Sequence, residues 1–260
     1  LKIINAFSLW NRIFAKIFNT MQWFESWFNT SYYHQLYKNR NEQEAQNFLH
    51  KLVPHLTQDK SAKFLDICCG KGRHSQVINN LGFEVIGYDL SKNSIEEAKK
   101  LEEENLHFHV HDMRKLFYTN YFDFALNLFT SFGYFSNERD NINALLSANK
   151  ALKENGILVI DFMNAIQTRN KMVPQETKTI DEITFNLSRR IENNSIVKEI
   201  HFKKNDEEFS YSEKVELLEL TNFKRLLEKS GFMIKEVYGN YELMPFTEES
   251  DRLIILAAKL

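Results

Sequence analysis

Short apolar runs alternate with longer amphipathic segments over residues 64–162 of the 260-residue chain. Short apolar runs predict buried strands, and apolar residues spaced three and four apart predict helices that bury one side. A repeated alternation of the two is typical of a parallel sheet that helices cover on both faces. The predicted strands are 64–68, 84–88, 106–110, 122–128 and 157–162, and the predicted helices are 73–81, 94–104 and 138–153.

The pattern changes between about 170 and 220, where β-branched and aromatic residues become frequent. Turn signals at Asn193-Asn194 and Asn205-Asp206 separate the segments 179–187, 196–202 and 209–217, which predict antiparallel strands. Because the strand–helix pattern resumes afterwards, we expect a small inserted sheet rather than an independent domain.

The chain then continues with one more helix, for which Thr221 is the expected N-cap, and with the strands 232–237 and 253–258. These last two strands predict a terminal hairpin that contains one antiparallel strand. A second cap is predicted earlier in the chain, where Ser94 and Glu97 fit a capping box.

Aromatic residues crowd the segment 21–37, and a helix is predicted from about Glu42 to Pro54. We therefore divide the chain into three parts. The expected organisation is a helical cap or lid at 1–55, a core at 56–168 and 218–260, and an inserted antiparallel sheet at 169–217.

Polar residues interrupt the segment 1–20, so no apolar run there approaches the roughly 18 residues that a membrane-spanning helix needs. No small-residue cleavage site follows, which argues against a signal peptide. We expect Met21 to be the natural start, with 1–20 as upstream sequence. The alternative is an amphipathic helix that packs on the domain.

Composition excludes several classes of partner. Lysine and arginine number 33 against 35 acidic residues, so the chain lacks the positive field that attracts nucleic acid. The two cysteines, Cys68 and Cys69, are adjacent and therefore badly placed to form a disulfide. We expect a cytoplasmic monomer or homodimer that acts on a small molecule and binds neither nucleic acid nor membranes.

A glycine-containing turn follows the strand 64–68 and opens the next helix, with Gly70 and Gly72 as its glycines. Such a turn lets backbone N–H groups approach a ligand with no Cβ in the way. The next strand ends on Asp89, 19 residues after Gly70, where a carboxylate can accept both hydroxyls of a ribose. Together these features predict a nucleoside site.

Two nucleoside ligands fit this pattern, a dinucleotide and S-adenosylmethionine. The dinucleotide fingerprint has a third glycine three residues after the second, but Ser75 stands at that position here. The predicted terminal hairpin is also not expected of a plain dinucleotide fold. The sequence therefore favours S-adenosylmethionine as the ligand.

The segment Asp66-Ile67-Cys68-Cys69-Gly70-Lys71-Gly72 resembles the acid-x-Gly-x-Gly-x-Gly motif of class I S-adenosylmethionine-dependent methyltransferases, with Cys68 in place of the first glycine. The resemblance covers about 59–161 and 221–260. It implies an α/β fold: a Rossmann-like, doubly wound, mostly parallel seven-stranded sheet with an antiparallel last strand, here with a small antiparallel β insertion.

The resemblance also implies roles for individual residues, all of them in cofactor binding. Gly70 and Gly72 would lie under the methionine part of the cofactor, and Asp89 would bind the ribose. The segment 32–37 is similar to the lid of small-molecule N-methyltransferases, in which a tyrosine and an arginine approach the cofactor's carboxylate. The implied cofactor-binding residues are Asp66, Cys68, Gly70, Gly72, Asp89, Leu90, Asp112 (to the adenine amine), Met113 (against the ring), Asn127, Leu128, Tyr33 and Arg40.

Two motifs that the sequence lacks limit the class of molecule that can accept the methyl group. After the fourth strand the chain reads Asn127-Leu128-Phe129-Thr130, without the Asn/Asp-Pro-Pro-aromatic motif of adenine or glutamine methylation, and it lacks the Pro-Cys pair of cytosine methylases. We therefore expect methyl transfer to a nitrogen, oxygen or carboxylate of a small molecule. An NAD(P)-dependent oxidoreductase and a non-catalytic nucleoside-binding protein are the alternatives.

No residue is assigned as the catalytic base, since aligning the donor with the acceptor is the main requirement of methyl transfer. His111, Tyr134 and Tyr33 are the candidates if a base is needed. Every second residue from His107 to His111 is a histidine, so a strand here would place His107, His109 and His111 on one face. No carboxylate or cysteine pattern completes a ligand set around them, so no metal is expected.

Overall fold

The computed structural model describes residues 22–38 and 42–260. The predictions for residues 1–20, for a start at Met21 and for Arg40 lie outside the described residues. Within the described part of the chain, no helix combines the length and the apolarity that crossing a membrane requires.

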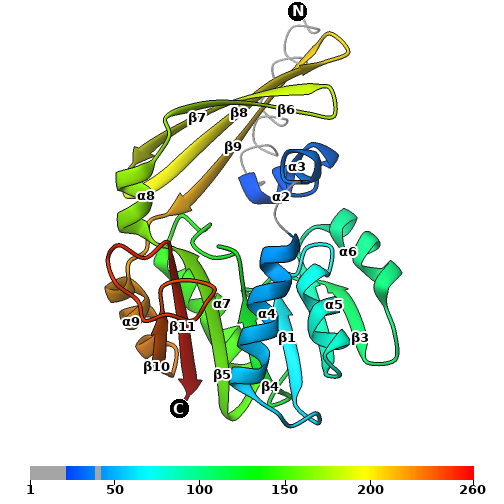
Figure 1. The fold of residues 1–260 in the computed structure, drawn as a ribbon, viewed down its shortest axis with the longest axis vertical. Coiled ribbons are helices and arrows are strands. Elements are labelled where there is room, and N and C mark those ends of the chain that lie inside the picture. Colours follow the sequence, from blue (N-terminus) through cyan, green and yellow to red (C-terminus); the bar gives the residue numbers. More distant parts are fainter. Residues whose placement is uncertain (1–21, 39–41) are drawn as a thin grey trace, which may run out of the picture.

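A seven-stranded sheet forms the lower half of the molecule in Figure 1, with the strand order β10-β11-β5-β4-β1-β2-β3. Strand β11 runs antiparallel to both of its neighbours, and the other pairs are parallel. This confirms the predicted mostly parallel sheet with an antiparallel last strand. Its strands are β1 (Lys63–Ile67), β2 (Glu84–Asp89), β3 (Leu106–Val110), β4 (Phe122–Asn127), β5 (Leu152–Met163), β10 (Phe232–Tyr238) and β11 (Arg252–Lys259).

Helices cover both faces of this sheet, because each face carries its own layer of buried apolar side chains. Leu52 and Ile78 belong to the core of one face, and Leu145 and Phe223 belong to the core of the other. Figure 1 shows α4 and α5 in front of the sheet. The helices of the first face are α4 (Glu42–Leu56), α5 (Arg73–Asn80) and α6 (Lys92–Ala98), and those of the second are α7 (Glu138–Ala151) and α9 (Leu220–Lys229).

Two predicted helix starts are wrong. Helix α6 begins after Ser91, whose hydroxyl accepts the backbone N–H of Ser94, so Ser94 lies inside the helix. Helix α9 begins after Glu219, which forms a capping box with Asn222, so Thr221 is also inside its helix. In both cases a second polar residue two or three positions upstream satisfies the free N–H groups of the first turn.

A four-stranded antiparallel sheet forms the upper half, with the strand order β6-β7-β8-β9. The inserted sheet is confirmed, but it has four strands where the pattern predicted three. Asp181 and Glu182 form the missed turn with positive φ values of 44° and 70°, in a stretch without glycine or asparagine. The strands are β6 (Gln175–Ile180), β7 (Ile183–Glu192), β8 (Ser195–Lys204) and β9 (Glu207–Glu216), and α8 (Ala165–Lys171) leads into them from β5.

Two short helices from the start of the described chain, α2 (Trp23–Trp27) and α3 (Ser31–Leu36), lie beneath this second sheet in Figure 1. They share one hydrophobic core with it, in which Trp27 packs with Phe185 and Ile200. We call α2, α3 and β6–β9 together the cap. Most buried side chains of the cap form a core of their own, whereas Phe24 of α2 packs into a core of the main sheet, so α2 connects the two parts.

Candidate functional site

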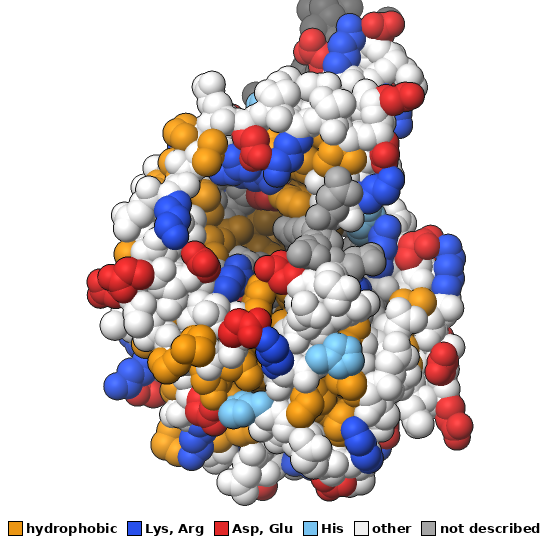
Figure 2. Space-filling view, viewed as in Figure 1, with side chains coloured by type: hydrophobic (Ala, Val, Ile, Leu, Met, Phe, Trp, Pro, Cys, Tyr) orange, Lys and Arg blue, Asp and Glu red, His pale blue; other side chains and the backbone are white. Residues whose placement is uncertain are grey.

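A cavity of about 1150 Å³ lies between the carboxyl ends of the main-sheet strands and the cap. In Figure 2 it is the hollow with apolar side chains inside and basic side chains along its upper rim. Pockets for a single small ligand usually measure about 300–1,000 Å³. This cavity is therefore larger than the usual site for one small ligand.

The glycine turn after β1 forms part of the cavity floor. Cys68 (φ 61°), Gly70 (φ 57°) and Gly72 (φ 79°) all adopt the left-handed conformation. A Cβ on Gly70 would meet no atom within 4 Å, so this residue presents bare backbone to the cavity. A Cβ on Gly72 would lie 2.5 Å from Cζ of Phe108, so this glycine faces the core and does not line the cavity.

Asp89 ends β2 beside this turn, where two main-chain groups hold its carboxylate. The N–H of Gly70 donates to Oδ2 at 3.0 Å, and the N–H of Ser91 donates to Oδ1 at 2.8 Å. Burial raises the pKa of Asp89, and these same N–H bonds oppose the rise. The residue lines the cavity together with Leu90, so its carboxylate is positioned to accept ligand hydroxyls.

Asp112 and Met113 form the adjoining wall after β3. Nε of Arg114 donates to both oxygens of Asp112 at 3.0 and 3.1 Å, and Nη2 donates to Oδ2 at 2.6 Å. Burial alone would raise the pKa of Asp112, but these bonds and the guanidinium charge outweigh it and lower the pKa. Sδ of Met113 lies 3.7 Å from Sγ of Cys68, so the two side chains form one apolar, sulfur-rich surface.

Two predicted site residues lie behind the cavity wall. Asp66 is fully buried and accepts a 2.6 Å hydrogen bond from Ser75, and burial raises its pKa to about 7. Asn127 is also buried, and its Nδ2 donates to the carbonyls of Ile67 and Ser131, while its Oδ1 has no partner among the described residues. The predicted residues that do line the cavity are Tyr33, Cys68, Gly70, Asp89, Leu90, Asp112, Met113 and Leu128.

The loop after β4 contains two consecutive non-glycine residues in the left-handed region, Phe129 (φ 56°) and Thr130 (φ 62°). Asp161 at the end of β5 holds both, since its Oδ2 accepts from the N–H of Phe129 and its carbonyl accepts from that of Thr130, each at 2.9 Å. Arg252 forms a 2.7 Å ion pair with Asp161, and Tyr241 donates to the same carboxylate. Sequence reasoning missed this cluster because its members come from separate strands and loops.

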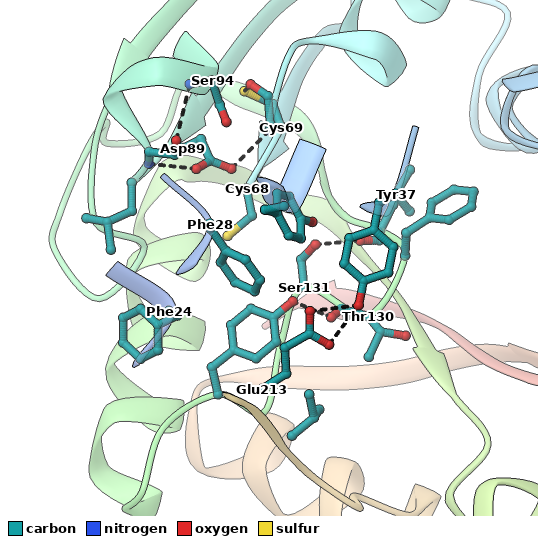
Figure 3. Close-up of a pocket in the computed structure, with 18 of the residues that line it drawn as sticks. Phe24, Phe28, Tyr37, Cys68, Cys69, Asp89, Ser94, Thr130, Ser131 and Glu213 are labelled. Carbon is teal, nitrogen blue, oxygen red and sulfur yellow. Dashed lines mark hydrogen bonds between the residues drawn. The ribbon is translucent and has the colours of Figure 1, made fainter. Parts of the chain in front are cut away.

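A second cluster that sequence reasoning missed lies on the cap side of the cavity, around Glu213 of β9. Nε1 of Trp27 donates to its Oε1 at 2.7 Å, and the hydroxyl of Tyr37 lies 2.7 and 2.8 Å from its two oxygens. In Figure 3 Glu213 and Asp89 lie on opposite sides of the cavity, with Phe28 between them in this view. The alternation of β9 indicated that one face is buried, but not that Glu213 faces a cavity.

The three candidate bases line the cavity, and two of them, His111 and Tyr134, form side-chain hydrogen bonds. Nε2 of His111 lies 2.9 Å from the carbonyl of Lys115, and the hydroxyl of Tyr134 donates to the carbonyl of Thr130 at 2.6 Å. The residues that the structure describes contain no group of three or more His, Cys, Asp or Glu side chains arranged to hold a metal ion.

Comparison with known proteins places these features in a wider context. The family model of a methyltransferase domain matches residues 58–231. A candidate methyltransferase of Geobacillus sp. (strain WCH70) is 25% identical over 232 residues, which cover 82% of this chain and 91% of that protein. The match thus includes both the strand–helix core and the inserted sheet.

Solved structures share the same fold. An S-adenosylmethionine-dependent methyltransferase from Clostridium acetobutylicum ATCC 824 has a TM-score of 0.74 at 16% identity, over 88% of this chain and 96% of that chain. The amino pentose methyltransferase CalS10 from Micromonospora echinaspora, solved with S-adenosylmethionine bound, has a TM-score of 0.68 at 16% identity, over 89% and 98%. At such identities the likeness is one of fold.

Proposed function

The chain belongs to the family of methyltransferase domains, and we propose that it methylates a small molecule that binds in the cap half of the cavity. It is a class I S-adenosylmethionine-dependent methyltransferase, and this identity decides against the two alternatives, an NAD(P)-dependent oxidoreductase and a non-catalytic nucleoside-binding protein.

The residues at the main-sheet end of the cavity fit S-adenosylmethionine. Gly70 leaves open space where a side chain would otherwise stand, and Asp89 offers a carboxylate that main-chain N–H groups hold in place. Cys68 and Met113 provide an apolar surface against which a ring would pack. When bound, S-adenosylmethionine supplies a methyl carbon on a sulfonium, and the sulfur leaves as a neutral thioether.

The observation that carries the proposal is the shared lining of one large cavity. Its floor comes from the strand ends of the main sheet, and its upper wall comes from the cap, including Ile196, Lys198 and Glu213. A nucleoside would occupy the floor, so the inserted sheet would face a second molecule of small size. CalS10, which has this fold, is an amino pentose methyltransferase, and its acceptor is of that size class.

The chain's own groups would then orient the two ligands and keep water out. Aromatic side chains from α2, α3 and their connection surround the space between floor and cap, where Phe28 contacts Tyr33 (ring centroids 4.8 Å apart) and Tyr134 (5.4 Å). Holding two reactants in alignment can supply roughly 7–11 kcal/mol of the barrier. We therefore propose the N-terminal helices as a lid and the inserted sheet as the acceptor wall.

Calorimetry with S-adenosylhomocysteine and NADH tests the donor half of this proposal. We expect S-adenosylhomocysteine to bind and NADH not to bind. The Asp89→Ala variant should bind S-adenosylhomocysteine at least about tenfold more weakly, because a charge-assisted hydrogen bond contributes about 1.5–3 kcal/mol.

Asp59→Ala is the matched control, since Asp59 is exposed before β1 and its carboxylate accepts hydrogen bonds from the neighbouring Ser61. Equal affinity of Asp89→Ala and the natural protein would remove Asp89 from the site. Turnover of a small-molecule panel with radiolabelled methyl donor tests the acceptor half. Methylation of protein or nucleic acid with no methylation of the panel would contradict a small-molecule acceptor.

A further inference from the structure

Three charged residues of the second sheet form a row along its cavity side. Arg189 pairs with Lys198 across β7 and β8, and Lys198 pairs with Glu213 across β8 and β9, so all three point to one face. All three line the cavity, although their side chains are only 13–17% exposed. Nη2 of Arg189 forms a 2.6 Å ion pair with Glu176 of β6, so its charge is already matched.

Glu213 differs from Arg189 because its shortest contacts are with neutral groups, although Lys198 forms a longer ion pair with it and also donates to the hydroxyl of Tyr37. Trp27 donates at 2.7 Å and Tyr37 lies at 2.7 and 2.8 Å, whereas the ammonium of Lys198 is 3.5 Å away. That last distance exceeds the normal range of about 2.7–3.2 Å for an N–H···O bond. The negative charge of Glu213 is therefore only partly offset.

The carboxylate of Glu213 also keeps capacity for at least one more donor. Ionised carboxylates accept about four hydrogen bonds. Tyr37 has a single hydroxyl proton, so it can donate to only one of the two oxygens at a time. A ligand with an N–H or O–H group on the cavity side of Glu213 would therefore find a hydrogen-bond acceptor there.

Aromatic rings surround this carboxylate. Tyr37 lies on it directly, Trp27 packs on Tyr211 with ring centroids 4.5 Å apart, and Phe28, Tyr33 and Tyr134 line the neighbouring wall. A carboxylate among aromatic faces favours a cationic ligand, because the ring faces are negative. A neutral hydroxyl would gain much less from the same surroundings.

From this geometry, and resting on the proposed function, we infer that the acceptor carries an amino group that binds to Glu213. An ammonium group must lose a proton before its nitrogen has a lone pair for methylation. Glu213 is placed to take that proton: the N–H bond breaks, its electron pair stays on nitrogen, and an O–H bond forms on the carboxylate.

Matched pairs of probes that differ only in the nitrogen test this inference. The pairs are benzylamine with benzyl alcohol, and glucosamine with glucose, titrated by calorimetry into the protein saturated with S-adenosylhomocysteine. We expect at least one amine to bind about tenfold or more tightly than its alcohol. The Glu213→Gln variant should abolish that difference. Amines that bind no better than alcohols, or no binding by either, would overturn the inference.

Glu199→Gln is the matched control, because Glu199 lies in the same sheet but bonds to Arg190 outside the cavity lining. It should keep the preference for amines. A second variant, Lys198→Met, covers the case that Glu213→Gln does not fold. Removing the cation of Lys198 should leave the affinity for amines equal or stronger. An acceptor that binds through its own negative charge would instead lose affinity in this variant. Titration with benzoate, an anionic probe, measures that loss.

The role of Glu213 would be contradicted if Lys198→Met lost the preference for amines. It would also be contradicted if the protein bound benzoate through Lys198 and did not bind the amines. Different results would contradict the proposed function and the inference about the acceptor. Absence of S-adenosylhomocysteine binding to the natural protein would contradict the proposed function itself. Normal S-adenosylhomocysteine binding without amine selectivity would contradict only the inference about the acceptor.

Discussion

The two halves of the cavity are built in different ways. In the floor, main-chain N–H groups of Gly70 and Ser91 hold Asp89, and all three residues lie in the short stretch of chain between the end of β1 and the start of α6. In the cap, side chains make the contacts, and Trp27 and Glu213 meet across 186 positions of the chain. A site made of backbone can persist while side chains change, whereas one made of side chains can be altered by single substitutions.

Asp161 is the clearest exception to a floor built of main-chain groups, because its side chain holds the loop after β4. Replacing a buried ion-pair partner leaves the other charge uncompensated, which costs about 3–5 kcal/mol. Asp161→Ala should therefore lower the melting temperature by roughly 10 °C, because 1 kcal/mol corresponds to about 2–4 °C in a chain of this size. It should also remove the bond from the N–H of Phe129 to the carboxylate, whereas the bond from the N–H of Thr130 to the main-chain carbonyl of residue 161 remains.

Differential scanning calorimetry measures the effect of Asp161→Ala. Asp251→Ala is the control, because the side chain of Asp251 is 80% exposed and its ion pair with Lys171 is 3.3 Å long. Exposed pairs contribute little to stability. Similar melting temperatures for both variants would show that the loop after β4 keeps its shape without Asp161.

The two turn glycines sharpen the comparison, because they share one conformation but face different surroundings. Gly72→Ala adds a methyl group 2.5 Å from the buried ring of Phe108, so overpacking of about 1–3 kcal/mol adds to the left-handed penalty of about 1–2 kcal/mol. Gly70→Ala has only the second penalty, since open space adjoins it. We expect a large loss of stability for Gly72→Ala, and a mainly weakened binding of S-adenosylhomocysteine for Gly70→Ala. Urea unfolding with calorimetry separates the two, and equal unfolding free energies would contradict this assignment.

The fold of the core could be predicted because its signals are local. Short apolar runs and helical spacing gave the seven strands of the main sheet and the antiparallel place of β11. The helix start and the turn that were not predicted lie where several neighbouring polar residues could play the same part. Ser91 competes with Ser94 as a cap, and the turn at Asp181 and Glu182 contains neither glycine nor asparagine, the residues that most often mark a turn with positive φ.

The residues of the site also differ in whether local sequence could predict them. The positions of Gly70 and Asp89 followed from sequence spacing, and the structure brings them together. Glu213 could not be found in this way, because the alternating pattern of β9 is compatible with either face being exposed. Only the register of β9 with β8, and the packing of α2 and α3, determine that Glu213 lies in the cavity.

Asp66 tests whether the floor depends on a side chain behind it. Burial raises its pKa to about 7, from an ordinary value of 3.8, while the bond from Ser75 opposes the rise. The folded state then holds a proton that the unfolded state has lost, so this group's contribution to stability falls as pH rises from about 4 to about 7. Asp66→Asn carries no such charge, and its stability relative to the natural protein should rise by on the order of 2–3 kcal/mol between pH 5 and pH 7.5.

Thermal unfolding at the two pH values measures this difference. Asp59→Asn is the control: hydrogen bonds from Ser61 lower the pKa of Asp59, so its contribution is already complete at pH 5. A parallel pH response of the natural protein and Asp66→Asn would show that Asp66 is ionised when buried. A loss of S-adenosylhomocysteine binding in Asp66→Asn would show that the floor is not built by backbone alone.

The smallest expected effect is at the cap, where Tyr37→Phe removes one hydroxyl from the contacts of Glu213. A hydrogen bond of this kind contributes about 0.5–1.5 kcal/mol, so the melting temperature should fall by only a few °C. Tyr32→Phe on α3 is the matched control, because Tyr32 packs its ring on Phe202 and Phe209. If the halves are built independently, Tyr37→Phe changes the affinity for the amine probes and leaves that for S-adenosylhomocysteine within about twofold. A parallel loss of both affinities would mean that the contacts of Glu213 also hold the floor in place, and the distinction between the two halves would fail.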